Sequence, residues 1–385
     1  MEFSTLGELC VSGKGHYGIA ASAVPYCKEL YTYLRITDIT DDGRINFSGL
    51  TSVADVNAEK YLLQPNDIVF ARTGGSTGRN YFYDGHDGKF VYAGFLIKFS
   101  IDSQKVNPKF IKYYCQSRNY KDWVSSYNTG STRGNINAQT YARMPVPMLP
   151  RKQQDGIVSV LESIDAKIEE NDHINENLEQ QAQALYYHMF VENMSPKWDK
   201  GTLSDIADIT MGQSPSGSSY NEEGEGTIFF QGRAEFGFRF PSIRLYTTEP
   251  KRMACANDIL MSVRAPVGDL NVAHTNCCIG RGLSAIHSKT GQPSFVLYTM
   301  FALKKQLNVF NGEGTVFGSI NRNSLNNMPI VIPSPESITA FEDTVAPIDD
   351  TIRNNYDEIC RLTQLRDSLL PKLMSGELDV SSLDI

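Results

Sequence analysis

One segment of this 385-residue chain occurs twice, 184 residues apart and without a gap. Gly134–Asn137 returns as Gly318–Asn321, and Ile164–Ile168 returns as Ile348–Ile352. The repeated segment joins a loop, a proline-rich stretch and a long helical pattern. A constant offset across such different kinds of sequence is typical of a duplicated structural unit. We therefore expect two copies of one unit, each a globular domain followed by a helix.

The bulk composition favours an intracellular protein without a metal or other cofactor. The length suits two domains with connecting elements. No apolar run approaches 18 residues and no secretory leader is visible, so we expect no membrane span. The seven cysteines are scattered and lack a CxxC pair, as in reduced cytoplasmic proteins. The six histidines show no metal-ligand spacing.

The net charge of −8 at first argues against a nucleic-acid partner, but its distribution reverses that interpretation. Residues 1–150 have a balance of +3 and residues 193–334 a balance of +2. The helical stretches 151–192 and 335–385 have balances of −6 and −7. Mildly basic domains beside acidic helices are compatible with DNA binding. The alternative is that exposed helices simply favour Glu and Asp.

The predicted fold class is α+β, with mixed α/β globular domains and long helices between them. Short apolar runs at Ile68–Ala71, Phe90–Ile97 and Ile259–Val263 predict strands. Asn107 and Pro108 predict the start of a helix that runs through Tyr114. The predicted regions are domain one (1–150), a central helical region (151–192), domain two (193–334), a C-terminal helical region (335–374) and a tail (375–385).

The long helices are predicted over residues 164–190 and 348–370, with Pro347 in the first turn of the second and Pro371 at its end. A heptad-like pattern favours an antiparallel coiled coil between them, with internal pseudo-two-fold symmetry. The expected seam residues are Ile164, Ile168, Asn171, Asn175, Leu178, Ala182 and Leu185 in the first helix, and Ile348, Ile352, Asn355, Ile359, Leu362, Arg366 and Leu369 in the second.

Asn171 and Asn355 occupy the same seam position, where a polar residue can fix the register of two helices. The alternative is that each helix packs on its own domain and merely tolerates the asparagine. A helix of this predicted length is roughly 35–40 Å long. That length is close to one turn of B-DNA, the spacing at which two-fold proteins meet successive half-sites.

Each domain closes with a similar signature, Gly130–Asn137 in the first copy and Gly314–Asn321 in the second. With the alternation of domains and helices, this signature resembles the specificity subunit of type I restriction–modification systems over the full length. The resemblance implies two target-recognition domains that each read one half of a split double-stranded DNA sequence. It also implies that the helices set the spacing and dock two methyltransferase subunits, and that a restriction subunit with translocase activity joins the larger complex. One departure is Val316-Phe317, where the first copy has Thr132-Arg133.

Two fragments resemble methyltransferase motifs. Phe310–Gly314 fits FxGxG, and Asn107–Phe110 resembles NPP[FY]. They lie about 200 residues apart in different domains, and no βαβ unit surrounds the glycine loop. Thr73–Arg79 is glycine-rich but lacks the GK[ST] of a P-loop. We therefore expect a binding subunit without its own active site; the alternatives are a self-contained methyltransferase and a coiled-coil protein adaptor.

Candidate DNA contacts are chosen by residue type and loop setting. Arginine and lysine are the usual partners of guanine, asparagine and glutamine pair with adenine, and hydroxyl groups hold phosphates. For each residue, an intradomain contact is the alternative. The candidates in the first copy are Lys14, His16, Tyr17, Arg72, Thr73, Ser76, Thr77, Arg79, Asn80, Ser131, Arg133 and Asn135. Those in the second copy are Gln213, Ser214, Ser216, Gln231, Arg233, Arg264, Arg281 and Thr315.

Overall fold

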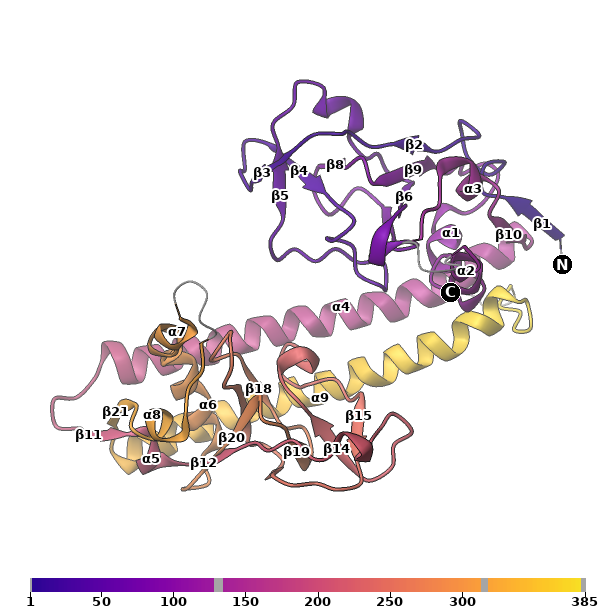
Figure 1. Cartoon of the computed structure of the whole chain (residues 1–385). Helices are drawn as coiled ribbons and strands as arrows, with labels where there is room; N and C mark the ends of the chain where they lie inside the picture. Colours follow the sequence, from indigo (N-terminus) through magenta and orange to yellow (C-terminus); the bar gives the residue numbers. More distant parts are fainter. Residues whose placement is uncertain (1, 128–133, 313–317, 382–385) are drawn as a thin grey trace. The chain divides into compact units, whose positions relative to one another are not determined.

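A computed structural model describes residues 2–127, 134–312 and 318–381 of the chain (Figure 1). The chain divides into two compact units. Unit 1 consists of residues 1–169 and 358–385, and unit 2 of residues 170–357. Each unit combines one globular domain with part of the two long helices α4 (Arg151–Tyr187) and α9 (Pro335–Met374). No described helix is both long and apolar enough to cross a membrane.

The domain of unit 1 consists of short strands with three small α-helices. Its strands are β1 (Glu2–Thr5), β2 (His16–Tyr17), β3 (Ala23–Pro25), β4 (Tyr31–Leu34), β5 (Thr51–Val53), β6 (Asp67–Ala71), β7 (Asn80–Tyr83), β8 (Phe90–Tyr92), β9 (Leu96–Ser100) and β10 (Pro145–Met148). Its helices are η1 (Ala58–Tyr61), η2 (Gly74–Ser76), α1 (Pro108–Tyr114), α2 (Arg118–Ser125) and α3 (Ala138–Ala142). The strands form the sheets β1-β10, β2-β9-β6-β7 and β3-β5-β4-β8.

The domain of unit 2 repeats this arrangement. Its strands are β11 (Asp199–Thr202), β12 (Ala207–Met211), β13 (Tyr220–Asn221), β14 (Thr227–Phe230), β15 (Leu245–Thr247), β16 (Met253–Ala254), β17 (Ile259–Ser262), β18 (Leu270–Val272), β19 (Cys277–Ile279), β20 (Leu283–Ser288) and β21 (Pro329–Ile332). Its helices are η3 (His188–Glu192), α5 (Leu203–Ile206), η4 (Gly217–Ser219), η5 (Arg233–Glu235), α6 (Pro293–Ala302), α7 (Lys304–Asn308), η6 (Val309–Asn311) and α8 (Arg322–Asn326). The sheets are β11-β21, β12-β20-β17-β18 and β13-β15-β14-β19-β16.

The duplication extends to backbone detail at the central strands β6 and β17. Asn66 and Asn257, just before these strands, have φ angles of 73° and 71°, a conformation that asparagine tolerates better than most residues. The carboxylates of Asp67 and Asp258 each accept a hydrogen bond of 2.8 Å from the backbone N–H three residues earlier. The same turn therefore introduces the same strand in both units.

Two predicted elements can be compared directly with the structure. Helix α1 begins where the sequence predicts, because the Asn107 side chain accepts a 3.0 Å hydrogen bond from the backbone N–H of Lys109. The single strand expected over Phe90–Ile97 is wrong in one respect. The run is divided into β8 and β9, which belong to different sheets, by the turn between Tyr92 and Leu96.

The long helices are longer than predicted, with 37 residues in α4 and 40 in α9. Pro347 and Pro371 were expected to begin and end a helix, but both lie inside α9. Both prolines are exposed, as are Asp343 and Asp367, whose carbonyl oxygens lose a helical hydrogen bond. Water can satisfy those carbonyl oxygens. The packing of buried residues such as Ile352 in the same helix then offsets the cost of the prolines.

The expected seam faces the interior of each unit. All fourteen seam positions are buried or half-buried. In unit 2 the helices pack antiparallel, because Asn175 contacts Asn355 while Tyr186 packs against Phe341. One of the two matched seam asparagines, Asn355, makes a polar contact across the helix pair. The Asn355 amide donates a 2.9 Å hydrogen bond to the side-chain oxygen of Asn175, one helical turn beyond Asn171. The predicted α+β fold with an antiparallel helix pair is confirmed.

A tyrosine–aspartate contact fastens each domain to a long helix. In unit 1 the Tyr113 hydroxyl donates a 2.9 Å hydrogen bond to Asp165 of α4. In unit 2 the Tyr298 hydroxyl donates a 2.9 Å hydrogen bond to Asp349 of α9. Both aspartates belong to the repeated segment found in the sequence. Burial raises the pKa of both tyrosines, so both hydroxyl groups remain proton donors.

Candidate nucleic-acid interface

One end of the sheet β2-β9-β6-β7 in unit 1 brings together loops that are distant in sequence. The backbone of Thr73, just after β6, forms an antiparallel bridge with Asn135. The backbone N–H of Arg72 donates to the carbonyl oxygen of Phe95, and the carbonyl oxygen of Arg72 accepts from the N–H of Ile136, at 3.0 and 2.9 Å. We call this surface loop edge 1, and it consists of Tyr17, Arg72, Thr73, Phe95 and Asn135.

The sheet β12-β20-β17-β18 of unit 2 ends in the same hydrogen-bond pattern. Arg264 forms an antiparallel bridge with Ser319. The N–H of Val263 donates to Gly282 at 3.0 Å, and its carbonyl oxygen accepts from Ile320 at 3.1 Å. We call this surface loop edge 2, and it consists of Gln213, Ser214, Arg264, Arg281 and Ser319.

A glycine at the same place in each frame allows two chain segments to approach closely. A β-carbon on Gly18 would lie 2.3 Å from the carbonyl oxygen of Ala93, and one on Gly212 would lie 2.2 Å from that of Gly280. Any side chain would therefore clash with backbone that is already hydrogen-bonded. The two loop edges share a hydrogen-bonded backbone frame and differ in the side chains that it presents.

The candidate arginines divide into two groups by their partners. Arg79 binds both carboxylate oxygens of Asp41, at 2.6 and 3.2 Å. Arg233 contacts Asp269 at 2.5 Å. Among the described residues, no carboxylate lies within salt-bridge distance of the other three candidate arginines whose positions are described, and all three belong to the loop edges: Arg72, Arg264 and Arg281. A cation that is not neutralised by a carboxylate is available to an external anion or base.

Several other candidates of unit 1 have structural roles. The prediction that Asn80 contacts DNA is corrected by the structure, because the Asn80 side chain is buried and its amide donates to the carbonyl oxygen of Cys115 at 3.1 Å. Thr77 donates from its hydroxyl to the carbonyl oxygens of Gly74 and Gly134. Asn80 therefore cannot contact DNA in this structure, and Thr77 serves the loop itself.

The remaining candidates are at or near the surface. In unit 1, Lys14 and His16 are exposed and Ser76 is half-buried. The His16 ring lies 3.1 Å from the hydroxyl of Ser12. In unit 2, Gln231 and Ser216 are exposed, and the Ser216 hydroxyl lies 2.8 Å from that of Ser218. Ser131, Arg133 and Thr315, with the Val316-Phe317 departure, lie outside the described residues.

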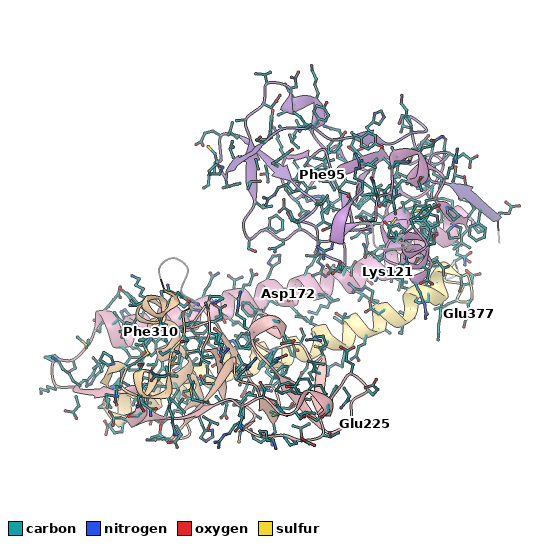
Figure 2. The ribbon with its side chains drawn as sticks, in the orientation of Figure 1. Phe95, Lys121, Asp172, Glu225, Phe310 and Glu377 are labelled. Carbon is teal, nitrogen blue, oxygen red and sulfur yellow. The ribbon has the colours of Figure 1, made fainter. Side chains whose placement is uncertain are left out.

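Phe95 is a residue of loop edge 1 that the sequence did not single out. It is labelled in Figure 2, and 59% of its side chain is exposed. The signal was present as Gly94-Phe95, an aromatic residue in a turn between two apolar strands. An exposed ring in such a turn can make apolar contact with a base.

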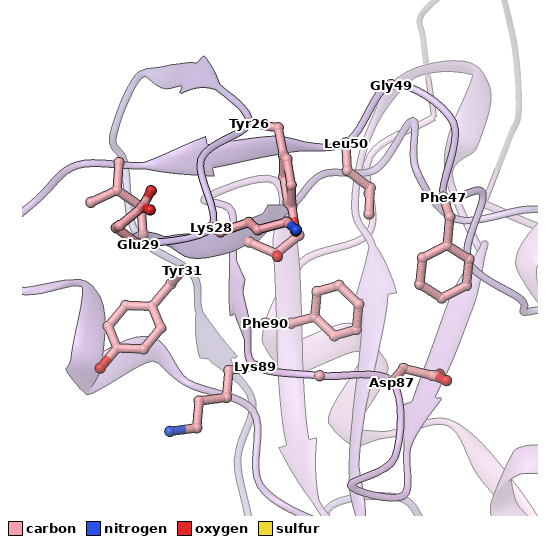
Figure 3. A pocket seen from close by; sticks show the side chains of 13 residues that line it. Tyr26, Lys28, Glu29, Tyr31, Phe47, Gly49, Leu50, Asp87, Lys89 and Phe90 are labelled. Carbon is pink, nitrogen blue, oxygen red and sulfur yellow. The ribbon is translucent and has the colours of Figure 1, made fainter.

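A hollow of about 650 Å³ lies elsewhere in unit 1, beside the sheet β3-β5-β4-β8 (Figure 3). Tyr26 and Leu50 point into it and Phe90 lies at its floor. Its two lysines, Lys28 and Lys89, are balanced by two carboxylates, Glu29 and Asp87. The lining therefore supplies no net charge that would favour a phosphate, and no candidate from the sequence belongs to it.

The class of protein that this fold defines is an α+β unit used twice, with arginines that lack a carboxylate partner at two matching loop edges. The chain belongs to a protein family described as the type I restriction modification DNA specificity domain. The family model matches residues 1–180 and 196–359, which together make up most of the chain.

Curated relatives carry corresponding descriptions. The chain is 28% identical over 378 residues to the candidate type I restriction enzyme MjaX specificity subunit of Methanocaldococcus jannaschii, covering 91% of this chain and 88% of that protein. It is 22% identical over 317 residues to the type I restriction enzyme MjaIX specificity subunit of the same organism, covering 74% and 72%.

Among solved structures, the type I restriction–modification system S subunit from M. genitalium matches with a TM-score of 0.58 at 18% identity, covering 97% of this chain and 95% of that chain. At that identity the likeness establishes the fold alone. The family places this chain among the DNA specificity subunits of type I restriction–modification systems.

Proposed function

We propose that each globular domain reads one half of a bipartite double-stranded DNA target and that the chain itself catalyses no reaction. The observation that carries the proposal is the pair of loop edges. They are built on one hydrogen-bond frame, they both present arginines that have no carboxylate partner among the described residues, and they differ in nearly every side chain. A common frame with different side chains suits two related modules with different base preferences.

The long helices would set the distance between the two half-targets and dock two methyltransferase subunits. Their regions, residues 151–192 and 335–385, have charge balances of −6 and −7, whereas the domain regions are mildly basic. Acidic helices would be repelled by DNA phosphates, so they suit contact with protein. A restriction subunit would join such a complex, and the catalytic groups would belong to the partners.

The experiment that tests half-target reading is a domain exchange. Residues 1–150 are replaced by the corresponding domain of a relative, and methylated sites are mapped genome-wide in cells that contain the partner subunits. We expect one half of the target to change while the other half and the gap stay the same. A change in both halves, or in neither, would contradict the assignment of one half to each domain.

The spacing role is tested by lengthening both helices. Four added residues extend each helix by roughly 6 Å, which corresponds to about two base pairs of DNA. We expect the unspecified gap in the target to grow by that amount while the two specified halves remain unchanged. An unchanged gap would refute the helices as a spacer.

The structure contains features that could suggest methyltransferase activity in the chain alone, but each has a local explanation. Asn107 caps α1 in unit 1. The segment Phe310–Asn311 lies in η6 of unit 2, where the Asn311 side chain accepts from the backbone N–H of Val267. Incubation of the isolated chain with methyl donor and DNA tests this alternative, and we expect no turnover.

A further inference from the structure

Arg72 on loop edge 1 has a guanidinium group that is poorly satisfied within the chain. Its Nε is buried and has no hydrogen-bond partner among the described residues. An arginine side chain has five N–H donors and no acceptor, and buried donors are almost always paired. No guanidinium N–H group of Arg72 donates to another described residue, and the side chain as a whole is only half-buried, so its outer N–H groups are available to a ligand from outside the chain.

The guanidinium is nevertheless held in place. Its Cζ atom lies over the ring of Tyr17, 5.1 Å from the ring centroid, a cation–π contact. The Tyr17 hydroxyl accepts a 3.1 Å hydrogen bond from the backbone N–H of Ala138, which fixes the ring. The Arg72 backbone is itself fixed by Phe95 and Ile136. A side chain held in this way loses little conformational freedom when it binds a ligand.

The chemistry of a fixed, planar arginine fits one base in particular. Two parallel N–H groups match the O6 and N7 acceptors of guanine in the major groove, which is the commonest specific contact between protein and DNA. A phosphate also accepts from arginine. However, the neighbouring exposed side chains are Phe95 and Asn135, which suit a thymine methyl group and an adenine edge. Loop edge 1 as a set is therefore suited to base edges.

The positions of unit 2 that match Arg72 and Tyr17 do not carry an arginine and an aromatic residue. The matching backbone hydrogen bonds place Val263 where unit 1 has Arg72. The matching strand registers place Met211 where unit 1 has Tyr17. On the basis of the proposed function, we propose that Arg72, stacked on Tyr17, reads a guanine in the half-target of unit 1, and that unit 2 reads its half without such a contact.

The test uses the full chain in complex with its methyltransferase partners and compares sequencing-based methylation maps. Arg72→Lys keeps the charge but loses the planar fork, so affinity for DNA that lacks the guanine should be largely retained while affinity for the target falls. Discrimination at one guanine of one half-target should fall on the order of 10- to 100-fold. Tyr17→Leu, which removes the supporting ring, should relax the same position by a smaller factor.

The matched controls are Arg79→Lys, an arginine paired with Asp41, and Arg264→Lys on loop edge 2. Arg79→Lys should leave the whole target sequence unchanged. Arg264→Lys should leave unchanged the half-target that unit 1 reads. Thermal unfolding checks that each variant folds. If an Arg72 variant does not fold, Tyr17→Leu tests discrimination at the same guanine independently.

Two results would overturn the inference. One is an unchanged target in Arg72→Lys. The other is an equal weakening on all sequences together with a shallower salt dependence in Arg72→Gln, which identifies a phosphate contact. Neither result affects the domain exchange, so half-target reading stands or falls separately.

Discussion

The two units carry the same tyrosine–aspartate contact but complete it with an arginine from different places. In unit 1, Asp165 is contacted at 3.2 Å by Arg366 of the other long helix. In unit 2, Asp349 is contacted at 2.8 Å by Arg239, which belongs to the globular domain. The duplicated position thus keeps its acidic residue, while the cation comes from whichever neighbour lies close enough.

The origin of the arginine determines which parts of the unit the tyrosine–aspartate–arginine contact joins. Arg239 also donates to Glu179 of α4, at 2.8 Å, so one domain residue binds both long helices. Only 4% of the Arg239 side chain is exposed, against 19% for Arg366. In unit 2 the domain and the helix pair therefore form one buried ionic cluster. In unit 1 the corresponding charges join the two helices to each other.

The largest expected effect follows from removing the buried cation. Arg239→Met leaves the carboxylates of Glu179 and Asp349 without a cation, although Asp349 keeps the hydrogen bond from Tyr298, and we expect unit 2 to lose about 3–5 kcal/mol of unfolding free energy. Arg366→Met should cost unit 1 about 1.5–3 kcal/mol, because Arg366 is more exposed than Arg239 and pairs with one half-buried carboxylate, Asp165, instead of two.

Urea unfolding can follow each unit separately, because the chain has one tryptophan in each: Trp123 in unit 1 and Trp198 in unit 2. Variants that carry a single tryptophan report one unit at a time. Equal losses in the two units would show that the difference in burial between the arginines has no energetic consequence.

A smaller effect tests whether the frames beneath the two loop edges are equivalent. Gly18→Ala and Gly212→Ala each force a β-carbon against backbone, and each should cost roughly 1–3 kcal/mol in its own unit. Gly75→Ala and Gly232→Ala, where the β-carbon meets nothing within 4 Å, are the matched controls. If only one of the two glycines is sensitive in unfolding measurements, the frames differ in rigidity.

The smallest effect concerns pH. Glu342 accepts from the backbone N–H groups of Ser294 and Phe295 at the start of α6, and burial raises its pKa. The native state then binds a proton more tightly than the unfolded state. The resulting contribution is fully present below the unfolded pKa of about 4.3 and is lost as the pH rises through the native value.

Glu342→Gln should remove this loss of unfolding free energy with rising pH. The loss is about 1.4 kcal/mol when the native pKa lies one pH unit above the unfolded pKa. In unit 1 the residue that accepts from the N–H at the start of α1 is the neutral Gln154, so that unit should lack this dependence. Unfolding of the two units between pH 4 and pH 7 checks the contrast, and identical pH profiles would contradict it.

The sequence predicted the part of the fold that the duplication repeats without gaps. The seam residues and the Asn107 cap follow local rules of periodicity and capping. The strand frame was not visible because insertions change the offset there: Thr73 and Arg264 are equivalent but lie 191 residues apart. Pro347 was misinterpreted because a proline's cost depends on whether the unpaired carbonyl oxygen faces water, which only the packing decides.

Candidate contacts with DNA were chosen by residue type, and type does not reveal partners. Arg72 and Arg79 lie seven residues apart in one glycine-rich loop. One is stacked on a ring without an acceptor for its Nε, and the other is bound by Asp41 from a distant turn. Asn80 has the amide that suits adenine, yet that amide is buried in the domain. These distinctions come from tertiary contacts that no local pattern contains.

The tyrosine–aspartate contact also bears on how such a chain can change during evolution. The hydroxyl group is carried by the domain and the carboxylate by a helix, so recombination at the boundary near residue 150 separates the two partners. An incoming domain that retains a tyrosine at this position can donate its hydroxyl hydrogen bond to the aspartate that the long helix already carries. In unit 1, where the arginine of this contact lies on a helix, a domain exchange therefore leaves the charges of the scaffold balanced. In unit 2 the incoming domain must also supply the arginine that pairs with Glu179 and Asp349.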